Sequence, residues 1–139
     1  MDFNTISLLF KHAKGYGHAK IRDAGVSDTE HKICTFLYFH SDAYQNMIAN
    51  YLMLDKTTVA KAIVSLEERG LIKRIQNPAN RRKNILNITD EGKKTIADVV
   101  DIYDEWLEKI ESCLSDAEKE QFHDYCIRIL EKAKEISVK

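Results

Sequence analysis

The side chains of this sequence that indicate a chemical function are hydrogen-bond donors and cations. One stretch supplies hydroxyl and ammonium donors from Lys56, Thr57, Thr58 and Lys61. A later stretch supplies cations from Lys73, Arg74, Arg81, Arg82 and Lys83. Groups of these types donate to phosphate oxygens and to the edges of bases. The chemistry that they offer is recognition of a nucleic acid.

No catalytic arrangement accompanies these donors. The sequence has no glycine-rich phosphate loop, no Cys-x-x-Cys pair and no Ser/His/Asp set with a local signature. Thr57 and Thr58 lack a nearby base that would turn a hydroxyl into a nucleophile. We therefore expect a protein that is not an enzyme, with no catalytic residue and no cofactor.

Metal and thiol chemistry are weaker candidates. Side chains able to bind a metal occur at Glu30, His31, Cys34 and His40. No later helix offers partners at a matching spacing, so no metal site is expected. The three cysteines are Cys34, Cys113 and Cys126. We expect them to be reduced and buried in apolar surroundings, because the first two lack the flanking cations or helix start that activates a thiol.

The first donor stretch belongs to a predicted helix-turn-helix. Residues 45–63 show two short helical patterns joined by a tight turn, and small Ala49 lets the two helices approach closely. Their shared apolar side consists of Ile48, Leu52, Leu54, Val59 and Ile63. Asp55 is a suitable N-cap for the second helix, and Gly70 can end it in the left-handed conformation. The donors of the first stretch then lie on the outside.

The second stretch belongs to a predicted β-hairpin. After Gly70 the apolar residues alternate, which indicates two short strands over residues 71–76 and 85–88. The loop between them, residues 77–83, holds the one proline of the chain and three successive cations. A basic hairpin directly after a recognition helix is a wing.

Together these residues resemble the MarR-type (multiple-antibiotic-resistance regulator) winged-helix transcription factors. The matching run extends from residues 48–49 through residues 66–74 and continues with residues 80–82 and 88–92, so it covers about half of the chain. The resemblance implies a fold that is mainly α with a small β-hairpin wing. In that fold a winged helix-turn-helix is flanked by long dimerisation helices.

Two positions depart from the family pattern. Asn80 stands where the family usually has Asp, which would leave at best a neutral hydrogen bond to orient the wing. Met53 stands at the turn of the motif, where a glycine or another small residue is usual. A left-handed Met53 would cost on the order of 1–2 kcal/mol.

The resemblance implies how the donors would bind double-stranded DNA, with the helix over residues 55–69 in the major groove. The residues that would face base edges or adjacent phosphates are Thr57, Thr58 and Lys61. The residues that would hold the phosphate backbone are Lys56, Lys73 and Arg74. The cations of the wing are Arg81, Arg82 and Lys83, of which Arg81 or Arg82 would enter or flank the minor groove. A two-fold symmetric dimer predicts a pseudo-palindromic operator.

The charge is segregated along the chain. The net charge is −1, but residues 55–94 hold ten Lys/Arg and five Asp/Glu, whereas residues 95–139 hold six and twelve. We expect a single winged-helix domain over residues 1–139. Its DNA-binding lobe is expected at residues 26–94, and residues 1–25 and 95–139 are expected to form a helical dimerisation region.

Apolar stripes on the flanking segments indicate a homodimer. A helix is predicted over residues 3–16, followed by looser chain up to Gly25. The longest helix is predicted over residues 90–113, and a last amphipathic helix begins after Ser115. Helices of this kind beside a small lobe need a partner to cover their apolar sides. We expect that partner to be a second copy of the chain.

No stretch indicates a membrane partner. No run approaches the roughly 20 apolar residues that span a bilayer, and residues 1–4 lack the basic start of a signal peptide. We therefore expect a cytoplasmic protein.

The family resemblance also implies a repressor that a small aromatic effector releases from DNA. The residues that could line an effector cleft are His12, Tyr16, His31, Phe39, Tyr44 and Tyr103. The same residues are equally well explained as core aromatics. Two alternatives stay open. One is a winged-helix protein-interaction module that does not bind DNA, and the other is a metal- or redox-responsive regulator of the same fold.

Overall fold

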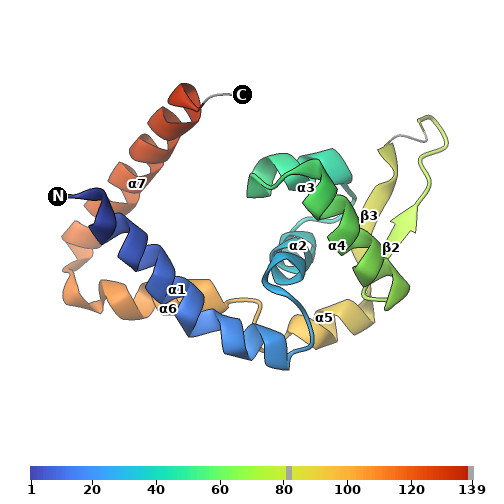
Figure 1. Cartoon of the computed structure of the whole chain (residues 1–139), viewed down its shortest axis with the longest axis horizontal. Helices are drawn as coiled ribbons and strands as arrows, with labels where there is room; N and C mark the ends of the chain where they lie inside the picture. The colour runs from blue at the N-terminus through green and yellow to red at the C-terminus, as the bar shows by residue number, and fades with distance from the viewer. Residues whose placement is uncertain (81–82, 138–139) are drawn as a thin grey trace. The chain divides into compact units, whose positions relative to one another are not determined.

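The structure, a computed structural model, describes residues 1–80 and 83–137 of the chain. The chain forms two compact units, Met1–Ile102 and Tyr103–Lys139 (Figure 1). Among the described residues, no helix is both long and apolar enough to cross a membrane.

The first unit is built from helices and a small sheet. Its elements are α1 (Phe3–Asp23), α2 (Asp28–Phe39), β1 (Ala43–Tyr44), α3 (Gln45–Leu52), α4 (Lys56–Glu68), β2 (Ile72–Ile75), β3 (Ile85–Ile88) and α5 (Asp90–Ile96). At the boundary begins α6 (Ile102–Ile110), and the second unit continues with the 3₁₀ helix η2 (Glu111–Cys113) and α7 (Asp116–Ile136). The predicted class, mainly α with a small β-hairpin wing, is confirmed.

Helix α2 is the centre of the first unit. It contacts α1, α3, α4, α5 and β3, and its apolar residues Ile33 and Leu37 are buried. From α4, the predicted stripe of Val59, Ile63 and Leu66 is fully buried. Burial of each such side chain contributes about 1.5–3 kcal/mol. The core therefore holds one side of α4 and leaves the other side to solvent.

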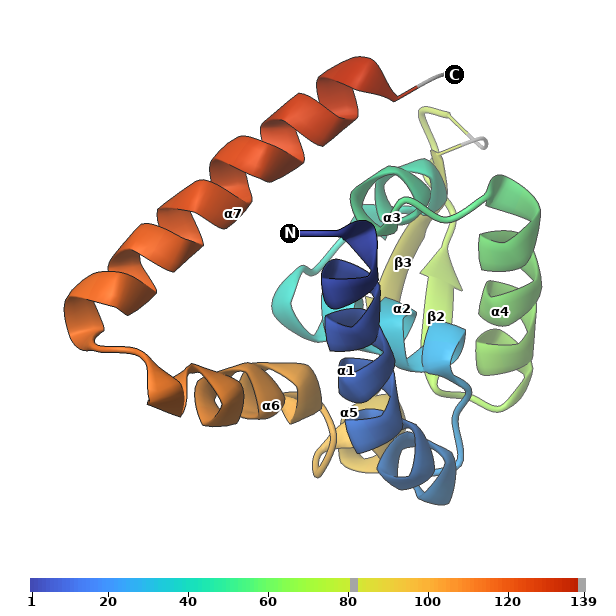
Figure 2. The ribbon, with the colours of Figure 1, turned by 60° about the vertical axis from the view of Figure 1, so that its left-hand side comes forward.

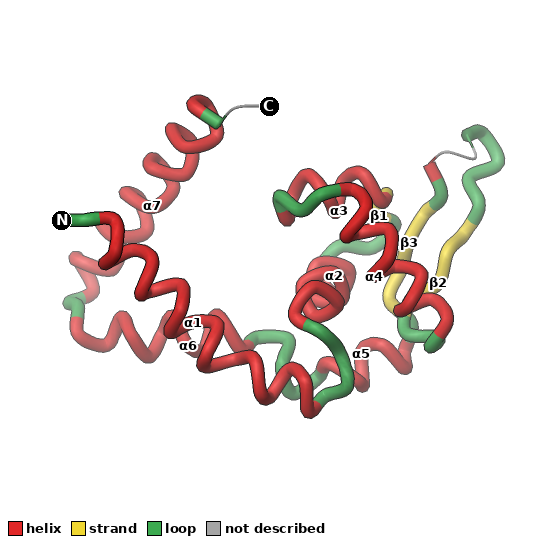
Figure 3. Tube along the Cα trace, viewed as in Figure 1, coloured by secondary structure: helices red, strands yellow, loops and turns green. Residues whose placement is uncertain are grey.

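The sheet is antiparallel, in the order β1-β3-β2. In the hairpin, Ile72 lies opposite Ile88 and Ile75 opposite Ile85, and Figure 3 shows the two strands running up to the loop that joins them. The two-residue strand β1 was not predicted, because two residues are too few to show an alternating pattern. It pairs with β3, with Ala43 opposite Leu86.

The hairpin is joined to α5 through Thr89 and Gly92. The hydroxyl of Thr89 lies 2.7 Å from the Gly70 carbonyl oxygen and 3.0 Å from the Leu71 carbonyl oxygen, and it accepts the Gly92 N–H at 3.0 Å. A Cβ added at Gly92 would lie 2.1 Å from the Leu71 carbonyl oxygen and 2.7 Å from Cγ1 of Ile88. A side chain at this position would therefore push the start of α5 away from the strands.

Helix α1 is longer than predicted. It continues beyond Tyr16 to Asp23. The expectation of loose chain over residues 20–25 is therefore wrong for residues 20–23. A glycine inside a helix costs about 1 kcal/mol relative to alanine, but here Gly17 and Ile21 are buried. The chain leaves the helix at Gly25, whose φ is +93°.

The helix predicted over residues 90–113 is interrupted, so that prediction is wrong. After Ile96, backbone bonds from Val99 to Ile96 (2.9 Å) and from Ile102 to Val99 (3.2 Å) span three residues instead of four. The three side chains are buried. The Nε2–H of His31 donates to the Val99 carbonyl at 2.6 Å, which gives this carbonyl a partner outside the helix. Burial lowers the pKa of His31, so the neutral imidazole makes this bond.

The turn of the helix-turn-helix is left-handed at Met53, with φ +53° and ψ +43°. A non-glycine residue in this conformation costs about 1–2 kcal/mol. The backbone N–H of Leu54 donates to the carbonyl of Ala49 at 3.1 Å and so closes the end of α3. The family departure at Met53 is thus accommodated by a strained backbone rather than by a different turn.

Apolar side chains of α1 and α7 are exposed in the single chain. On α1, Phe3 is 78% and Phe10 72% exposed. Helix α7 has no buried residue, and it exposes Tyr125, Ile127, Ile129, Leu130 and Ile136. Cys113 and Cys126 are exposed too, so the expectation of buried cysteines is correct only for Cys34.

We predict that Gly92→Ala destabilises the first unit by roughly 1–3 kcal/mol, because the new methyl group overlaps the Leu71 carbonyl. Chemical denaturation followed by circular dichroism measures the effect. Gly15→Ala is the matched control, because a Cβ there has no neighbouring atom within 4 Å. In the interior of α1 the control should stabilise by about 0.5–1 kcal/mol. Equal stability of the Gly92→Ala variant and the original protein would contradict the prediction.

Candidate nucleic-acid interface

The start of α4 is fixed by Asp55 and Thr58. The Asp55 carboxylate accepts the Thr58 N–H at 2.8 Å and the Thr58 hydroxyl at 2.5 Å. These bonds, the one from the hydroxyl first, lower the pKa of Asp55, so the cap is ionised at neutral pH. The predicted N-cap is therefore present, and the Thr58 hydroxyl is already engaged in it. Lys56 and Thr57, which lie between the two capping residues, are exposed.

The outward side of α4 carries a row of exposed residues. Beginning at Thr57, the row continues with Lys61, Val64 and Glu68, at spacings of four, three and four residues. Residues spaced in this way lie on one side of a helix. Thr57 and Lys61 were predicted to contact DNA, and the structure places both in this row. Val64 was not predicted, although its spacing from Lys61 already places it on the same side.

The end of α4 is held to α2 by the carboxylate of Glu30. Its Oε2 accepts the Ser65 hydroxyl at 2.9 Å and Nη2 of Arg69 at 2.5 Å, and its Oε1 accepts the Ser27 N–H at 2.8 Å. Nη1 of Arg69 donates to the Gly25 carbonyl at 2.6 Å. Glu30 is buried. Burial alone would raise its pKa, but the bonds from Ser27, Ser65 and Arg69 together hold that pKa below its usual value.

This network was not predicted. The capping box of Ser27 and Glu30 was recognised in the sequence and is present. The same carboxylate also reaches Ser65 and Arg69, which lie 35 and 39 residues further along the chain. Nothing local in the sequence indicates contacts over that separation. Because of the contacts that Glu30 makes with Ser65 and Arg69, α4 cannot shift along α2 without breaking charge-assisted hydrogen bonds.

The strand β2 carries the predicted backbone-binding cations. Lys73 and Arg74 follow Ile72 on this strand, and Figure 2 shows the strand running beside α4. Nε of Arg74 lies 3.5 Å from Oε2 of Glu67 on α4. At the far end of the loop, Nζ of Lys83 lies 5.9 Å from the centre of the Tyr44 ring. The predicted wing residues Arg81 and Arg82 lie outside the described residues.

The residues predicted to line an effector cleft are spread over several elements. His12 and Phe39 are exposed, Tyr16 and Tyr44 are half-buried, and His31 is buried. Tyr103 belongs to the other compact unit. The effector cleft stays a prediction.

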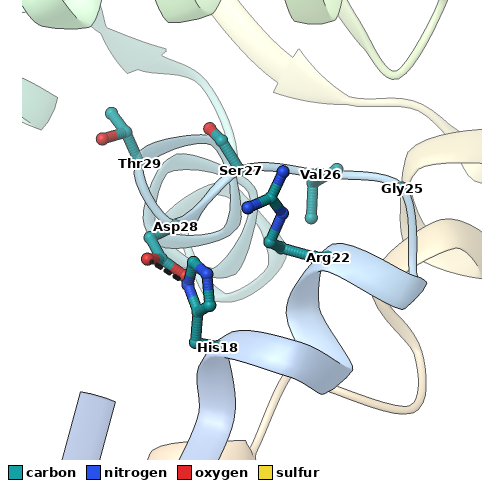
Figure 4. A pocket seen from close by; sticks show the side chains of 7 residues that line it. All are labelled: His18, Arg22, Gly25, Val26, Ser27, Asp28 and Thr29. Carbon is teal, nitrogen blue, oxygen red and sulfur yellow. Dashed lines mark hydrogen bonds and ion pairs between the residues drawn. The ribbon is translucent and has the colours of Figure 1, made fainter. Parts of the chain in front are cut away.

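A cavity of about 580 Å³ lies between the end of α1 and the start of α2 (Figure 4). It is lined by His18, Arg22, Gly25, Val26, Ser27, Asp28 and Thr29. Nδ1 of His18 and Oδ2 of Asp28 are 2.9 Å apart at its edge. None of the six predicted cleft residues lines it. Of the residues considered as metal ligands, Glu30, His31 and His40 have other partners. Among the described residues no group of three or more His, Cys, Asp or Glu side chains is placed to hold a metal.

Known proteins are similar to this chain in sequence and in fold. A model of the MarR family matches residues 26–83, which extend from the start of α2 into the wing. The HTH-type transcriptional regulator BilQ of Clostridioides difficile is 30% identical over 95 residues, 63% of this chain and 64% of that protein. The chain therefore spans slightly less than two thirds of that curated relative's length.

Two solved structures have the same fold. A MarR transcriptional regulator from Methanosarcina mazei superposes with a TM-score of 0.83 at 27% identity, over 96% of each chain. The S. aureus MepR-DNA complex superposes with a TM-score of 0.83 at 24% identity, over 95% of this chain and 98% of that one. The predicted winged-helix fold is confirmed.

We predict that Glu30→Gln destabilises the protein by about 1.5–3 kcal/mol at pH 7, because it removes the charge from the hydrogen bonds to Arg69 and Ser65. The folded-state pKa of Glu30 lies below its ordinary value of 4.5. The stabilisation is therefore complete above the unfolded-state pKa and is lost as the pH falls through the folded-state pKa.

Denaturant titrations between pH 7 and pH 3 would test this. The difference between the variant and the original protein should shrink as the pH falls below about 4.5. Glu68→Gln, at an exposed position of the same helix, is the matched control and should change stability by less than about 0.5 kcal/mol. Equal losses in the two variants would show that the Glu30 network does not hold α4.

Proposed function

Because this chain belongs to the MarR family, we propose that it is a homodimeric, sequence-specific DNA-binding regulator that represses transcription. The observation that supports this most directly is the row of exposed residues on α4, which begins with the donors Thr57 and Lys61. The opposite side of the same helix is fully buried at Val59 and Ile63. A helix fixed on one side and lined with donors on the other is suited to the major groove.

Each subunit would lay α4 in a major groove. Thr57 and Lys61 would donate to base edges or to adjacent phosphates, as would Thr58 after giving up its bond to Asp55. Lys56, Lys73 and Arg74 would bind phosphates on either side of the groove, and the wing cations would lie at the minor groove. Two-fold symmetry would place the half-sites about 10–10.5 base pairs apart.

The exposed apolar sides of α1 and α7 support a second copy as the partner. Large exposed apolar side chains gathered on a helix often mark an interaction surface. On α1 the exposed residues include Leu9 and Phe10, and on α7 none of the side chains is buried. Pairing with a second chain would cover both helices and fix the distance between two copies of α4.

Release by a small aromatic effector is part of the same proposal. An effector releases DNA only if it binds more tightly to a dimer whose recognition helices are wrongly spaced. The predicted cleft residues include His12, Tyr16 and Tyr103. A candidate effector with equal calorimetric affinity for the free protein and the DNA complex would be excluded.

We predict that the protein binds an operator upstream of its own gene at least about 10³-fold more tightly than random duplex, with affinity that falls steeply as salt rises. Lys61→Ala should weaken operator binding by about 1–3 kcal/mol if the lysine contacts a base edge. Fluorescence anisotropy over a salt series measures both effects. Lys132→Ala, which removes an exposed cation from α7, is the matched control and should leave the affinity unchanged.

Weak binding that is equal for every duplex and indifferent to Lys61→Ala would overturn the DNA-binding proposal. That result would support the rival class, a winged-helix module that binds protein partners. Metal analysis and thiol titration of the purified protein would separately test the metal- and redox-responsive alternatives.

We predict that Phe10→Asp shifts the protein from dimer to monomer, because a charge would be buried in the apolar interface at a side chain that is now 72% exposed. Multi-angle light scattering over a range of protein concentrations measures the shift, which should correspond to about 2 kcal/mol or more per dimer. Lys11→Asp is the control, because at about 3.6 residues per turn this side chain lies roughly 100° around α1 from Phe10. A monomeric original protein would contradict the homodimer.

A further inference from the structure

Val64 is an exposed aliphatic residue in the middle of the row on α4. Its side chain is 47% exposed, whereas the valine and isoleucine on the inner side of the helix, Val59 and Ile63, are fully buried. Figure 2 shows α4 at the outer edge of the first unit, with the strands of the wing to one side of it. Among the described residues of the unit, none buries Val64.

The chemistry of valine limits what Val64 could recognise. It has no hydrogen-bond donor or acceptor, so it cannot read the polar edge of a base or bind a phosphate. The apolar feature of the major groove is the 5-methyl group of thymine, which side chains read by apolar contact. A β-branched side chain in a helix also has one strongly preferred rotamer, so its two methyl groups are held in place before binding.

The position of Val64 relative to Lys61 sets where that thymine lies. Residues three apart on a helix have Cβ atoms about 5–6 Å apart, and successive bases of a strand are about 3.4 Å apart along the duplex axis. A contact from Val64 would therefore fall one or two base pairs from the pair that Lys61 contacts. The Glu30 network, which joins Ser65 and Arg69 to α2, holds this part of α4 in place.

We propose that Val64 is a specificity-determining residue that reads the 5-methyl group of one thymine in each half-site, one or two base pairs from the contact of Lys61. This inference rests on the proposed function, because it requires α4 to enter the major groove. It goes beyond that function in naming a base and the chemical group by which the base is distinguished.

The test uses the full-length protein and an operator selected by it from a random duplex library. Each thymine of the half-site is replaced in turn by deoxyuridine, symmetrically in both half-sites, which removes only the methyl group. Binding is measured by fluorescence anisotropy for the original protein and for Val64→Ala. The variant should fold, because Val64 is exposed and alanine favours the helix, and circular dichroism checks this.

At one position, deoxyuridine should weaken binding of the original protein by about fourfold per half-site, which corresponds to the loss of one buried methyl group. Val64→Ala should bind the unmodified operator about as weakly, and the effect of deoxyuridine at that position should vanish. Thr57→Ala is the matched control, since it alters the same row and should leave the deoxyuridine effect in place.

A selected operator that the protein binds specifically, but in which no thymine shows an effect dependent on Val64, would overturn the inference and leave the proposed function intact. A library from which no sequence is enriched would overturn the proposed function itself, and the inference with it.

Discussion

The carboxylate of Glu30 is the interaction on which the arrangement of the winged-helix unit depends. One oxygen completes the N-cap of α2 through Ser27, and the other accepts from Ser65 and Arg69 at the end of α4. A buried carboxylate is costly unless it is fully hydrogen-bonded, and here every bond comes from an element that must be placed correctly. The same charge therefore starts one helix and positions another.

Local signals in the sequence were sufficient for most of the winged helix. Asp55 at the start of α4, Gly70 at its end and the change to alternating apolar residues each act within a few positions, so each could be recognised without knowledge of the fold. The interruption after Ile96 could not be recognised. At the interruption the Val99 carbonyl accepts from His31, which lies 68 residues away in the chain, and the apolar pattern of residues 96–110 is equally compatible with an unbroken helix.

At the candidate interface, some features follow from the helical period and others do not. The exposure of Thr57 and Lys61 follows from the helical period alone, and the structure agrees. The Thr58 hydroxyl donates to Asp55. This bond depends on the side-chain geometry at the cap, which the spacing of residues in the sequence does not predict. The exposure of Val64 does not follow from its residue type, because a valine in an amphipathic helix ordinarily belongs to the core. Its neighbours at Val59 and Ile63 already fill that side of α4.

The distribution of the three cysteines gives the two units different chemical reactivity. Cys34 is buried in α2, and burial, followed by the charge of Glu30, raises the pKa of its thiol to about 12. Cys113 and Cys126 are exposed, and both lie in the second unit. A maleimide dye applied to the folded protein would therefore spare Cys34 in the winged helix and react at Cys113, while the proposed dimer would shield Cys126 on α7. A fluorophore could thus be attached without altering any residue of the winged helix.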